Sequence, residues 1–200
     1  MNIALIGYGK MGKAIEDVAL QKHHKIILKI DVDNARDLTI ENLQKADVAI
    51  EFTNADNAVV NITKCFEADV PVVCGTTGWL NNFEEIKKLC IEKNGAFLYS
   101  SNYSIGVNIF FELNKKLAEL MEHHLEYEVE VEEIHHTAKK DAPSGTAITI
   151  AEEILKHLTS KKKWVNKSTV AKSELSIISK RIDPAAGTHK ITYHSAIDDI

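Results

Sequence analysis

The sequence predicts an α/β fold in its first half, with a doubly wound parallel sheet, and an α+β second half with a mixed or antiparallel sheet. Three observations predict this division. Short apolar runs alternate with helical patterns over residues 1–103, and a G-x-G-x-x-G spacing follows the first of these runs. A strict two-residue alternation then appears in "LEYEVEVEE" at residues 125–133. We therefore expect two domains, residues 1–103 and 104–200.

Composition describes a globular chain of 200 residues, 44% hydrophobic and 26% charged, with a formal net charge of -5. That charge argues against nucleic acid or an anionic membrane as the main partner, but a local basic pocket could still bind a small anion. Cys65, Cys74 and Cys90 lack C-x-x-C spacing, which favours buried thiols in a reducing cytoplasm over disulfides or structural zinc. The start "MNIALIGYG" has no charged region before its apolar run, as a secretory signal would, and no apolar run approaches membrane-spanning length.

The first half opens with the pattern of a dinucleotide-binding unit. "NIALI" is apolar without alternation, as expected of a buried parallel strand, and Gly7, Gly9 and Gly12 come directly before a helical pattern. In that context the three glycines allow a tight turn, close approach of a pyrophosphate and close helix–strand packing. Together with the alternation this predicts a Rossmann-type sheet with strands at residues 2–6, 25–30, 48–52, 72–74 and 97–99 and helices at 57–67 and 83–92.

Ligands of such sheets bind at the carboxyl ends of the strands. Asp31 follows the second strand, where an acid that binds a ribose is expected, although a helix or turn cap is an alternative reading. Three further loops lie at that edge: "FTNAD" at 52–56, "GTTG" at 75–78 and "SSNYS" at 100–104. Alone, "GTTG" could equally be a plain turn. Its place after the fourth strand favours cofactor contact through Thr76 and Thr77.

The second half begins with an amphipathic helix from residue 105 to 124. In "LEYEVEVEE", Leu125, Tyr127, Val129 and Val131 alternate with glutamates that we interpret as a solvated face. The alternation breaks at Glu133 and Ile134, which suggests a bulge or strand end. Segments 168–181 and 188–196 also have strand patterns.

The stretch "EIHHTAKKDAPSGTA" at 133–147 concentrates groups that carry protons and bind anions. His135 and His136 point to opposite sides of an extended chain, and Lys139 and Lys140 follow in a loop. Ser144 is a candidate N-cap for a helix over 145–158, which leaves the N–H groups of Gly145 and Thr146 as free donors. The combination suits a small dianion that must be protonated. A structural role for each histidine remains open, whereas a metal site lacks an obvious third ligand.

The motifs "GYGKMG", "FT", "GTTG", "SSNYSIGVN" and "EIHHTAKKDAPSGTA", in this order, resemble the dihydrodipicolinate reductase family over the whole chain. The resemblance implies hydride transfer from NADH or NADPH, without a metal, to a cyclic imine dicarboxylate in lysine and diaminopimelate biosynthesis. It implies His135 as proton donor and acceptor, Lys139 as general acid, and His136, Gly145 and Thr146 as substrate carboxylate ligands. It also implies a homotetramer built through the sheet of a substrate-binding and oligomerisation domain, residues 104–200. The implied cofactor residues are Gly7, Tyr8, Gly9, Lys10, Met11, Gly12, Asp31, Phe52, Thr53, Gly75, Thr76, Thr77, Ser100, Ser101, Asn102 and Tyr103.

Two departures from the family pattern stand out. "AGTHK" at 186–190 replaces a more usual Gly-Glu-His, and the sequence ends at "SAIDDI" without the family's C-terminal return helix, so we expect weakened turnover. Two rival functions also remain. One is another Rossmann-type reductase, for example a semialdehyde or homoserine dehydrogenase; a semialdehyde dehydrogenase of the acylating type would need a nucleophilic cysteine, for which Cys74 is the candidate. The other is a non-catalytic nucleotide sensor, which would bind NADH without turnover. Asp31 favours NADH, whereas Arg36 could pair with the 2′-phosphate of NADPH.

Overall fold

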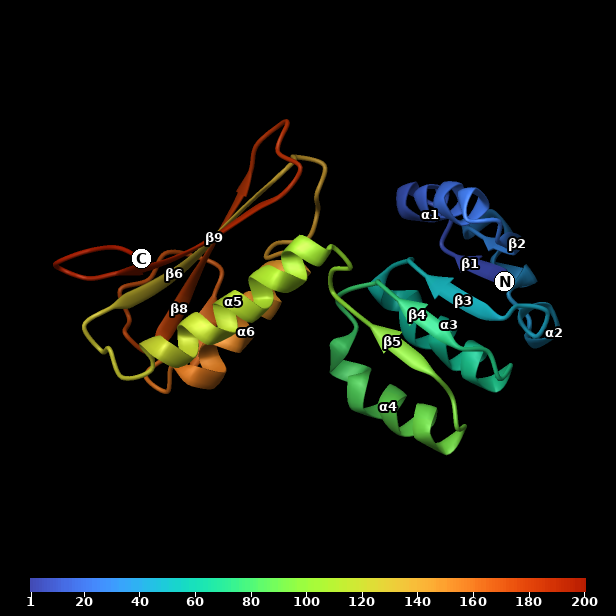
Figure 1. Cartoon of the computed structure of the whole chain (residues 1–200), viewed down its shortest axis with the longest axis horizontal. Helices are drawn as coiled ribbons and strands as arrows, with labels where there is room; N and C mark the ends of the chain where they lie inside the picture. The colour runs from blue at the N-terminus through green and yellow to red at the C-terminus, as the bar shows by residue number, and fades with distance from the viewer. The chain divides into compact units, whose positions relative to one another are not determined.

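The computed structural model describes all 200 residues, and the chain divides into two compact units, Met1–Ser101 and Asn102–Ile200. Unit 1 contains a five-stranded sheet in the order β2-β1-β3-β4-β5, with every neighbouring pair parallel (Figure 1). The order reverses between β1 and β3, which confirms the predicted doubly wound sheet. Its strands are β1 (Asn2–Ile6), β2 (Lys25–Ile30), β3 (Val48–Glu51), β4 (Val72–Cys74) and β5 (Phe97–Tyr99).

Helices cover both faces of this sheet, because alternate residues of its strands are apolar on both sides. Ile3 and Leu5 pack with Ala19 of α1 (Lys10–Gln21) on one face. Ala4 and Ile6 join the larger core on the other face, beneath α3 (Ala55–Glu67) and α4 (Phe83–Glu92) (Figure 1). The sequence patterns did not predict the short helices η1 (Val32–Asp37), α2 (Ile40–Leu43) and η2 (Leu80–Asn82).

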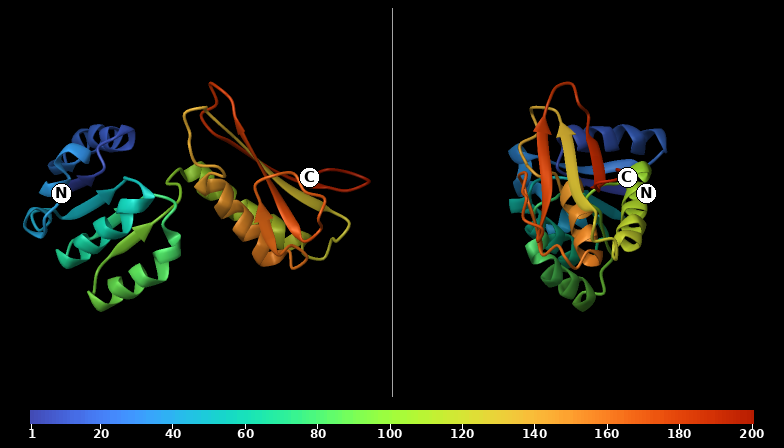
Figure 2. Two further views of the ribbon diagram at one scale, coloured as in Figure 1. Left: turned by 180° about the vertical axis from the view of Figure 1, so that it is seen from behind. Right: turned by 90° about the vertical axis from the view of Figure 1, so that its left-hand side faces the viewer.

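Unit 2 contains a mixed four-stranded sheet in the order β7-β8-β6-β9. The pairs β7–β8 and β8–β6 are parallel, and β6–β9 is antiparallel. The helices α5 (Ile105–Met121) and α6 (Gly145–His157) lie side by side on one face, where they bury the core of the unit (Figure 2). The strands are β6 (Glu128–His135), β7 (Lys163–Val165), β8 (Glu174–Arg181) and β9 (Thr188–His194), of which β7 was not predicted.

The prediction of a bulge or strand end at Glu133 and Ile134 is wrong. The strand continues to His135 without a shift in register against either neighbour, so Glu133 and His135 occupy the same buried face as Val129 and Val131. A hydrophobicity pattern could not reveal this, because the last two buried positions are polar. Leu125 was placed on the apolar face but is 72% exposed and precedes the strand.

Glu128 and Glu130 are exposed on the opposite face of β6, as the solvated-face interpretation requires, and Glu132 forms an ion pair with Lys180. No helix of the structure combines the length and the apolar character needed to cross a lipid bilayer.

Candidate active site

The glycine loop of unit 1 has the shape that a bound pyrophosphate requires. Gly7 has a φ of 95° and lies so close to Phe52 that a Cβ would stand 2.0 Å from its carbonyl oxygen. A Cβ on Gly9, in contrast, would meet nothing within 4 Å, so space is open where the phosphates would approach the backbone. Gly9 is also the N-cap of α1, with no capping side chain and no acidic residue in the first turn. Free N–H groups at this positive helix end fit an anion.

Two loops at the carboxyl edge of the unit 1 sheet are fastened to each other. The backbone N–H of Thr53 donates to Oγ1 of Thr76 at 2.8 Å, and Trp79 Nε1 donates to the carbonyl of Thr76 at 2.7 Å. Thr76 is 5% exposed, so its hydroxyl holds the neighbouring loop, and Thr77 is the more accessible of the two threonines. The completely buried Glu51 accepts hydrogen bonds from Thr53 and Asn61 beneath both loops.

Asp31 is exposed at the end of β2, where its carboxylate accepts a hydrogen bond from Val32 N–H at 2.8 Å. Asn34 completes a capping box by accepting from the backbone N–H of Asp31 at 2.7 Å. The capping role that the sequence left open is therefore present. Tyr8, which is part of the glycine loop, donates a hydrogen bond to Glu16, and Nζ of Lys29 lies 5.0 Å from the centre of the Tyr8 ring.

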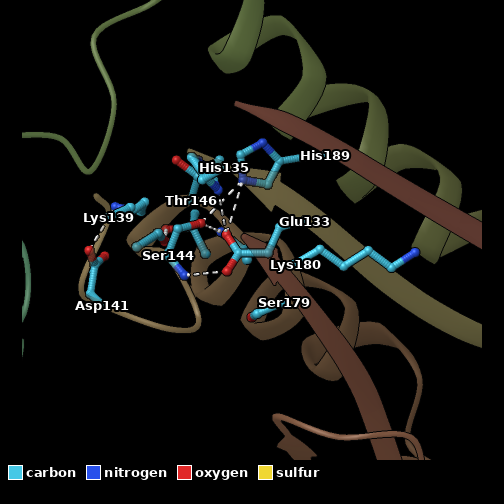
Figure 3. A network of polar contacts seen from close by, with 12 residues as sticks. Glu133, His135, Lys139, Asp141, Ser144, Thr146, Ser179, Lys180 and His189 are labelled. Carbon is cyan, nitrogen blue, oxygen red and sulfur yellow. Dashed lines mark hydrogen bonds and ion pairs between the residues drawn. The ribbon is translucent and has the colours of Figure 1, made fainter. Parts of the chain in front are cut away.

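In unit 2 the buried end of β6 forms a cluster around the carboxylate of Glu133, which is 0% exposed (Figure 3). Its Oε1 accepts from the backbone N–H of Ser144 at 3.1 Å and from Nη2 of Arg181 at 3.1 Å. Its Oε2 lies 3.1 Å from Nδ1 of His135 and 3.9 Å from Nε2 of His189. The 3.1 Å separation is within ion-pair distance, although the two atoms are not aligned as a hydrogen bond.

The electrostatics of this cluster follow from burial and hydrogen bonding. Burial alone would raise the pKa of Glu133, but hydrogen bonds from Ser144, Ser179 and Arg181 outweigh it and hold that pKa below its ordinary value. Burial lowers the pKa of His135, and the nearby Glu133 carboxylate only partly opposes it. Burial also lowers the pKa of His189, with a further contribution from His135. At neutral pH the cluster is thus an ionised carboxylate beside two mainly neutral imidazoles.

The start of α6 has the cap and the free N–H donors expected from the sequence. Ser144 is the N-cap, and its Oγ accepts from the N–H of Ala147 at 3.2 Å. The backbone N–H groups of Gly145 and Thr146 donate to no group of the chain. Asn102 Nδ2 approaches Oγ1 of Thr146 at 3.4 Å, so a residue assigned to the cofactor by resemblance contacts one assigned to the substrate.

The structure gathers some of the predicted residues and leaves others apart. His135, Ser144 and Thr146 lie around Glu133, whereas Lys139 forms an ion pair with Asp141 at 2.8 Å in the adjoining loop (Figure 3). His136 follows the end of β6 and, as expected, does not share the buried face with His135.

Sequence reasoning missed Glu133, Arg181 and His189 as site residues. The signal for Glu133 was available, because it continues the two-residue period of Val129 and Val131 to His135. Arg181 and His189 belong to strands whose pairing with β6 only the fold reveals.

Cys74 does not suit the nucleophile that an acylating dehydrogenase would need. The thiol is completely buried and its Sγ lies 3.0 Å from Oε2 of Glu51. Burial, and then the Glu51 carboxylate, raise the pKa of the Cys74 thiol far above its ordinary value. A nucleophilic cysteine needs the opposite environment.

A dinucleotide-dependent reduction requires a loop that a pyrophosphate can approach and a group that exchanges protons. The glycine loop of unit 1 fits the first requirement, and the buried His135 of unit 2 fits the second. The fold and the site thus define an oxidoreductase of the dinucleotide-dependent class. Family models described as the N-terminus and the C-terminus of dihydrodipicolinate reductase match residues 1–103 and 106–200, respectively. The chain belongs to the dihydrodipicolinate reductase family.

Individual relatives agree with this assignment. The 4-hydroxy-tetrahydrodipicolinate reductase of Christiangramia forsetii is 47% identical over 204 residues, covering 100% of this chain and 82% of the relative. That of Methanosarcina acetivorans is 32% identical over 195 residues, covering 96% and 72%. A dipicolinate-bound dihydrodipicolinate reductase from Paenisporosarcina sp. TG-14 has the same fold, with a TM-score of 0.68 at 23% identity over 100% of this chain and 85% of that one.

Proposed function

We propose that the chain catalyses the NAD(P)H-dependent reduction of 4-hydroxy-tetrahydrodipicolinate, or dihydrodipicolinate derived from it, to tetrahydrodipicolinate in lysine and diaminopimelate biosynthesis. The observation that carries the proposal is the buried His135 beside the free N-terminal donors of α6. A cyclic imine dicarboxylate needs both: donors for its carboxylates and a proton for its nitrogen. The family membership supplies the identity of the substrate.

The reduction adds one hydride and one proton to the conjugated C=C–C=N system of the substrate, and the product keeps its imine. The hydride adds to the C=C carbon farther from the imine, the electron pair shifts toward the ring nitrogen, and the nitrogen takes the proton. Tautomerisation of the resulting enamine then restores the C=N bond. The reduced nicotinamide supplies the hydride when bound. His135 supplies the proton, together with Lys139 as general acid once its ammonium leaves Asp141. Gly145 and Thr146 bind a carboxylate through their N–H groups, and His136 assists. A dianion so close to His135 raises the imidazole pKa, which loads the proton donor when substrate is present.

The cofactor-binding part of the proposal rests on the glycine loop from Gly7 to Gly12 and on the carboxyl edge of the unit 1 sheet. Asp31 would bind the ribose, which favours NADH or comparable use of the two nucleotides. The remaining contacts are those the resemblance implies, at residues 52–53, 75–77 and 100–103.

The proposal includes no metal. Donor atoms of Glu133, His135 and His189 lie within 4.8 Å of one another, a spacing that a metal could accept. The guanidinium of Arg181 already neutralises the carboxylate, however, and a cation would have to bind beside that charge. We also place the protein in a reducing cytoplasm, where Cys65, Cys74 and Cys90 would stay outside disulfides, as they do in the structure. The strand face bearing Glu128 and Glu130 would form the tetramer that the family implies.

The test measures NADH oxidation at 340 nm, coupled to an upstream synthase that generates the unstable substrate. His135→Gln and Lys139→Ala should lower kcat by about 10²–10⁴-fold, as expected for loss of a positioned acid. His123→Gln is the matched control for the histidine variant, and Lys140→Ala, at the residue next to Lys139, is the matched control for the lysine variant. Both side chains are exposed and neither has an assigned role. NADH affinity should be unchanged in all four variants.

Turnover near the wild-type rate in both His135→Gln and Lys139→Ala would show that the roles are wrongly assigned. A wild-type chain that binds NADH but oxidises none of it with this substrate would instead support the nucleotide-sensor alternative.

A further inference from the structure

We propose that Glu133 is a positioning residue for His135: its carboxylate accepts a hydrogen bond from Nδ1–H and so leaves Nε2 as the nitrogen that exchanges a proton with the substrate. This inference rests on the proposed function, because it assigns a tautomer to the imidazole named there as proton donor.

The first support is the match between two otherwise unpartnered atoms. Oε2 of Glu133 and Nδ1 of His135 are both buried side-chain atoms without a hydrogen bond to any other group, and they lie 3.1 Å apart. Water has no access to the carboxylate, since Glu133 is 0% exposed. At this distance an Nδ1–H donor satisfies both atoms. The other ring nitrogen near Oε2, Nε2 of His189, is farther away at 3.9 Å, beyond hydrogen-bond distance.

The second support is the way the other carboxylate oxygen is held. Oε1 receives two donors, the Ser144 N–H and the Arg181 guanidinium, both at 3.1 Å. Arg181 is fixed in turn by the carbonyl of Asp141 at 2.5 Å and that of Lys180 at 2.8 Å. With Oε1 occupied by donors from two other elements, the carboxylate has one orientation, and that orientation presents Oε2 to His135.

The third support lies on the opposite side of the imidazole. A Cβ on Gly187 would stand 3.2 Å from Nε2 of His135, so glycine at this position leaves the space beside that nitrogen unfilled. Nδ1 therefore faces a buried carboxylate, and Nε2 faces backbone without a side chain. The charged and titratable groups around the ring are Glu133, His189, Lys139, Arg181 and Asp141. Of these, Glu133 has an oxygen 3.1 Å from Nδ1.

The substitution Glu133→Gln distinguishes a positioning role from a purely structural one, because only the positioning role predicts a change in the tautomer of His135. In Glu133→Gln the amide oxygen must face Ser144 N–H and Arg181, because both are donors. The amide NH2 then faces Nδ1 of His135 and requires a lone pair there, which moves the ring proton to Nε2. The substitution keeps the volume of the side chain but reverses the tautomer.

The experiment records imidazole ¹⁵N shifts of ¹⁵N-histidine-labelled protein by long-range ¹H–¹⁵N correlation, without substrate or cofactor, and assigns His135 by the signal lost in His135→Gln. We expect Nδ1 to be protonated in the wild type and Nε2 in Glu133→Gln. Turnover by Glu133→Gln should fall by about 10²-fold or more in kcat, with the NADH KM unchanged and partial recovery in Glu133→Asp. Glu132→Gln is the matched control, because Glu132 lies on the opposite face of β6 and pairs with Lys180.

The proposal is overturned if the wild-type His135 carries its proton on Nε2, or if the Glu133→Gln spectrum keeps the wild-type tautomer. The wild-type spectrum alone decides the matter should Glu133→Gln fail to fold. An inactive wild type whose His135 is protonated at Nδ1 would contradict the proposed function and leave this inference supported.

Discussion

Ser144 performs two structural tasks with one hydroxyl, and its removal should cost more than the loss of an ordinary helix cap. Its Oγ accepts from Ala147 N–H at 3.2 Å at the start of α6 and lies 3.2 Å from Nε2 of His189. Loss of an N-cap side chain costs about 1 kcal/mol. Loss of a hydrogen bond to a buried partner adds about 1 kcal/mol more. We therefore expect Ser144→Ala to lower the free energy of unfolding of unit 2 by about 2 kcal/mol.

Ser104 provides the matched control within the same unit. It is the exposed N-cap of α5, and its Oγ accepts from Val107 N–H at 3.4 Å without a second buried partner. Ser104→Ala should cost about 1 kcal/mol or less. Urea unfolding can be followed through Trp164, which packs against the core of unit 2, with Trp79→Phe present in every variant to remove the other tryptophan. Equal unfolding midpoints and equal slopes for the two serine variants would refute the two-task account of Ser144.

Two further predictions concern the ligands. Asp31→Ala should reduce any preference for NADH over NADPH in kcat/KM, because the carboxylate at the end of β2 would no longer oppose a 2′-phosphate. Asp33 is also exposed, and Asp33→Ala should leave the preference unchanged. A strong preference of the native enzyme for NADPH would contradict the role assigned to Asp31. Binding of pyridine-2,6-dicarboxylate should take up protons near neutral pH, since burial lowers the pKa of His135 and of His189 in the free protein and a bound dianion raises both. Calorimetry in buffers of different ionisation enthalpy measures this proton uptake. An affinity that is independent of pH between 6 and 8, with no proton uptake, would show that the ligand does not raise the pKa of either histidine.

Unit 1 was largely predictable from sequence because its signals are local. Each strand is a short apolar run, the helices have clear periodicity, and the glycine spacing sits between the first strand and the first helix. The helix Phe83–Glu92 and the strands Asn2–Ile6 and Lys25–Ile30 have the predicted bounds. The short elements η1, α2 and η2 escaped prediction, because a single turn leaves too few residues for a period to be seen.

The site in unit 2 was predictable only in part, since its contacts join residues far apart in sequence. His135 and the Ser144 cap are within one motif and were found. Arg181 and His189 come from two other strands, and only the pairing of β8 and β9 with β6 brings them to Glu133. Glu133 was read as the end of a pattern, because hydrophobicity alone cannot distinguish a buried, paired carboxylate from an exposed one.

The unbroken period of β6 also limits how this strand can change during evolution. Val129, Val131, Glu133 and His135 share one face of β6. The same two-residue spacing therefore places both the apolar core residues and the proposed proton donor, His135. Inserting or deleting one residue within the strand, upstream of His135, would exchange the two faces on one side of the change. If the pairing of His135 were kept, the residues before the change would be the ones that flip, and glutamates would turn toward the helices. Substitutions can be accepted here one at a time, whereas single-residue length changes cannot. Length variation among homologues should therefore be confined to the loops on either side of β6.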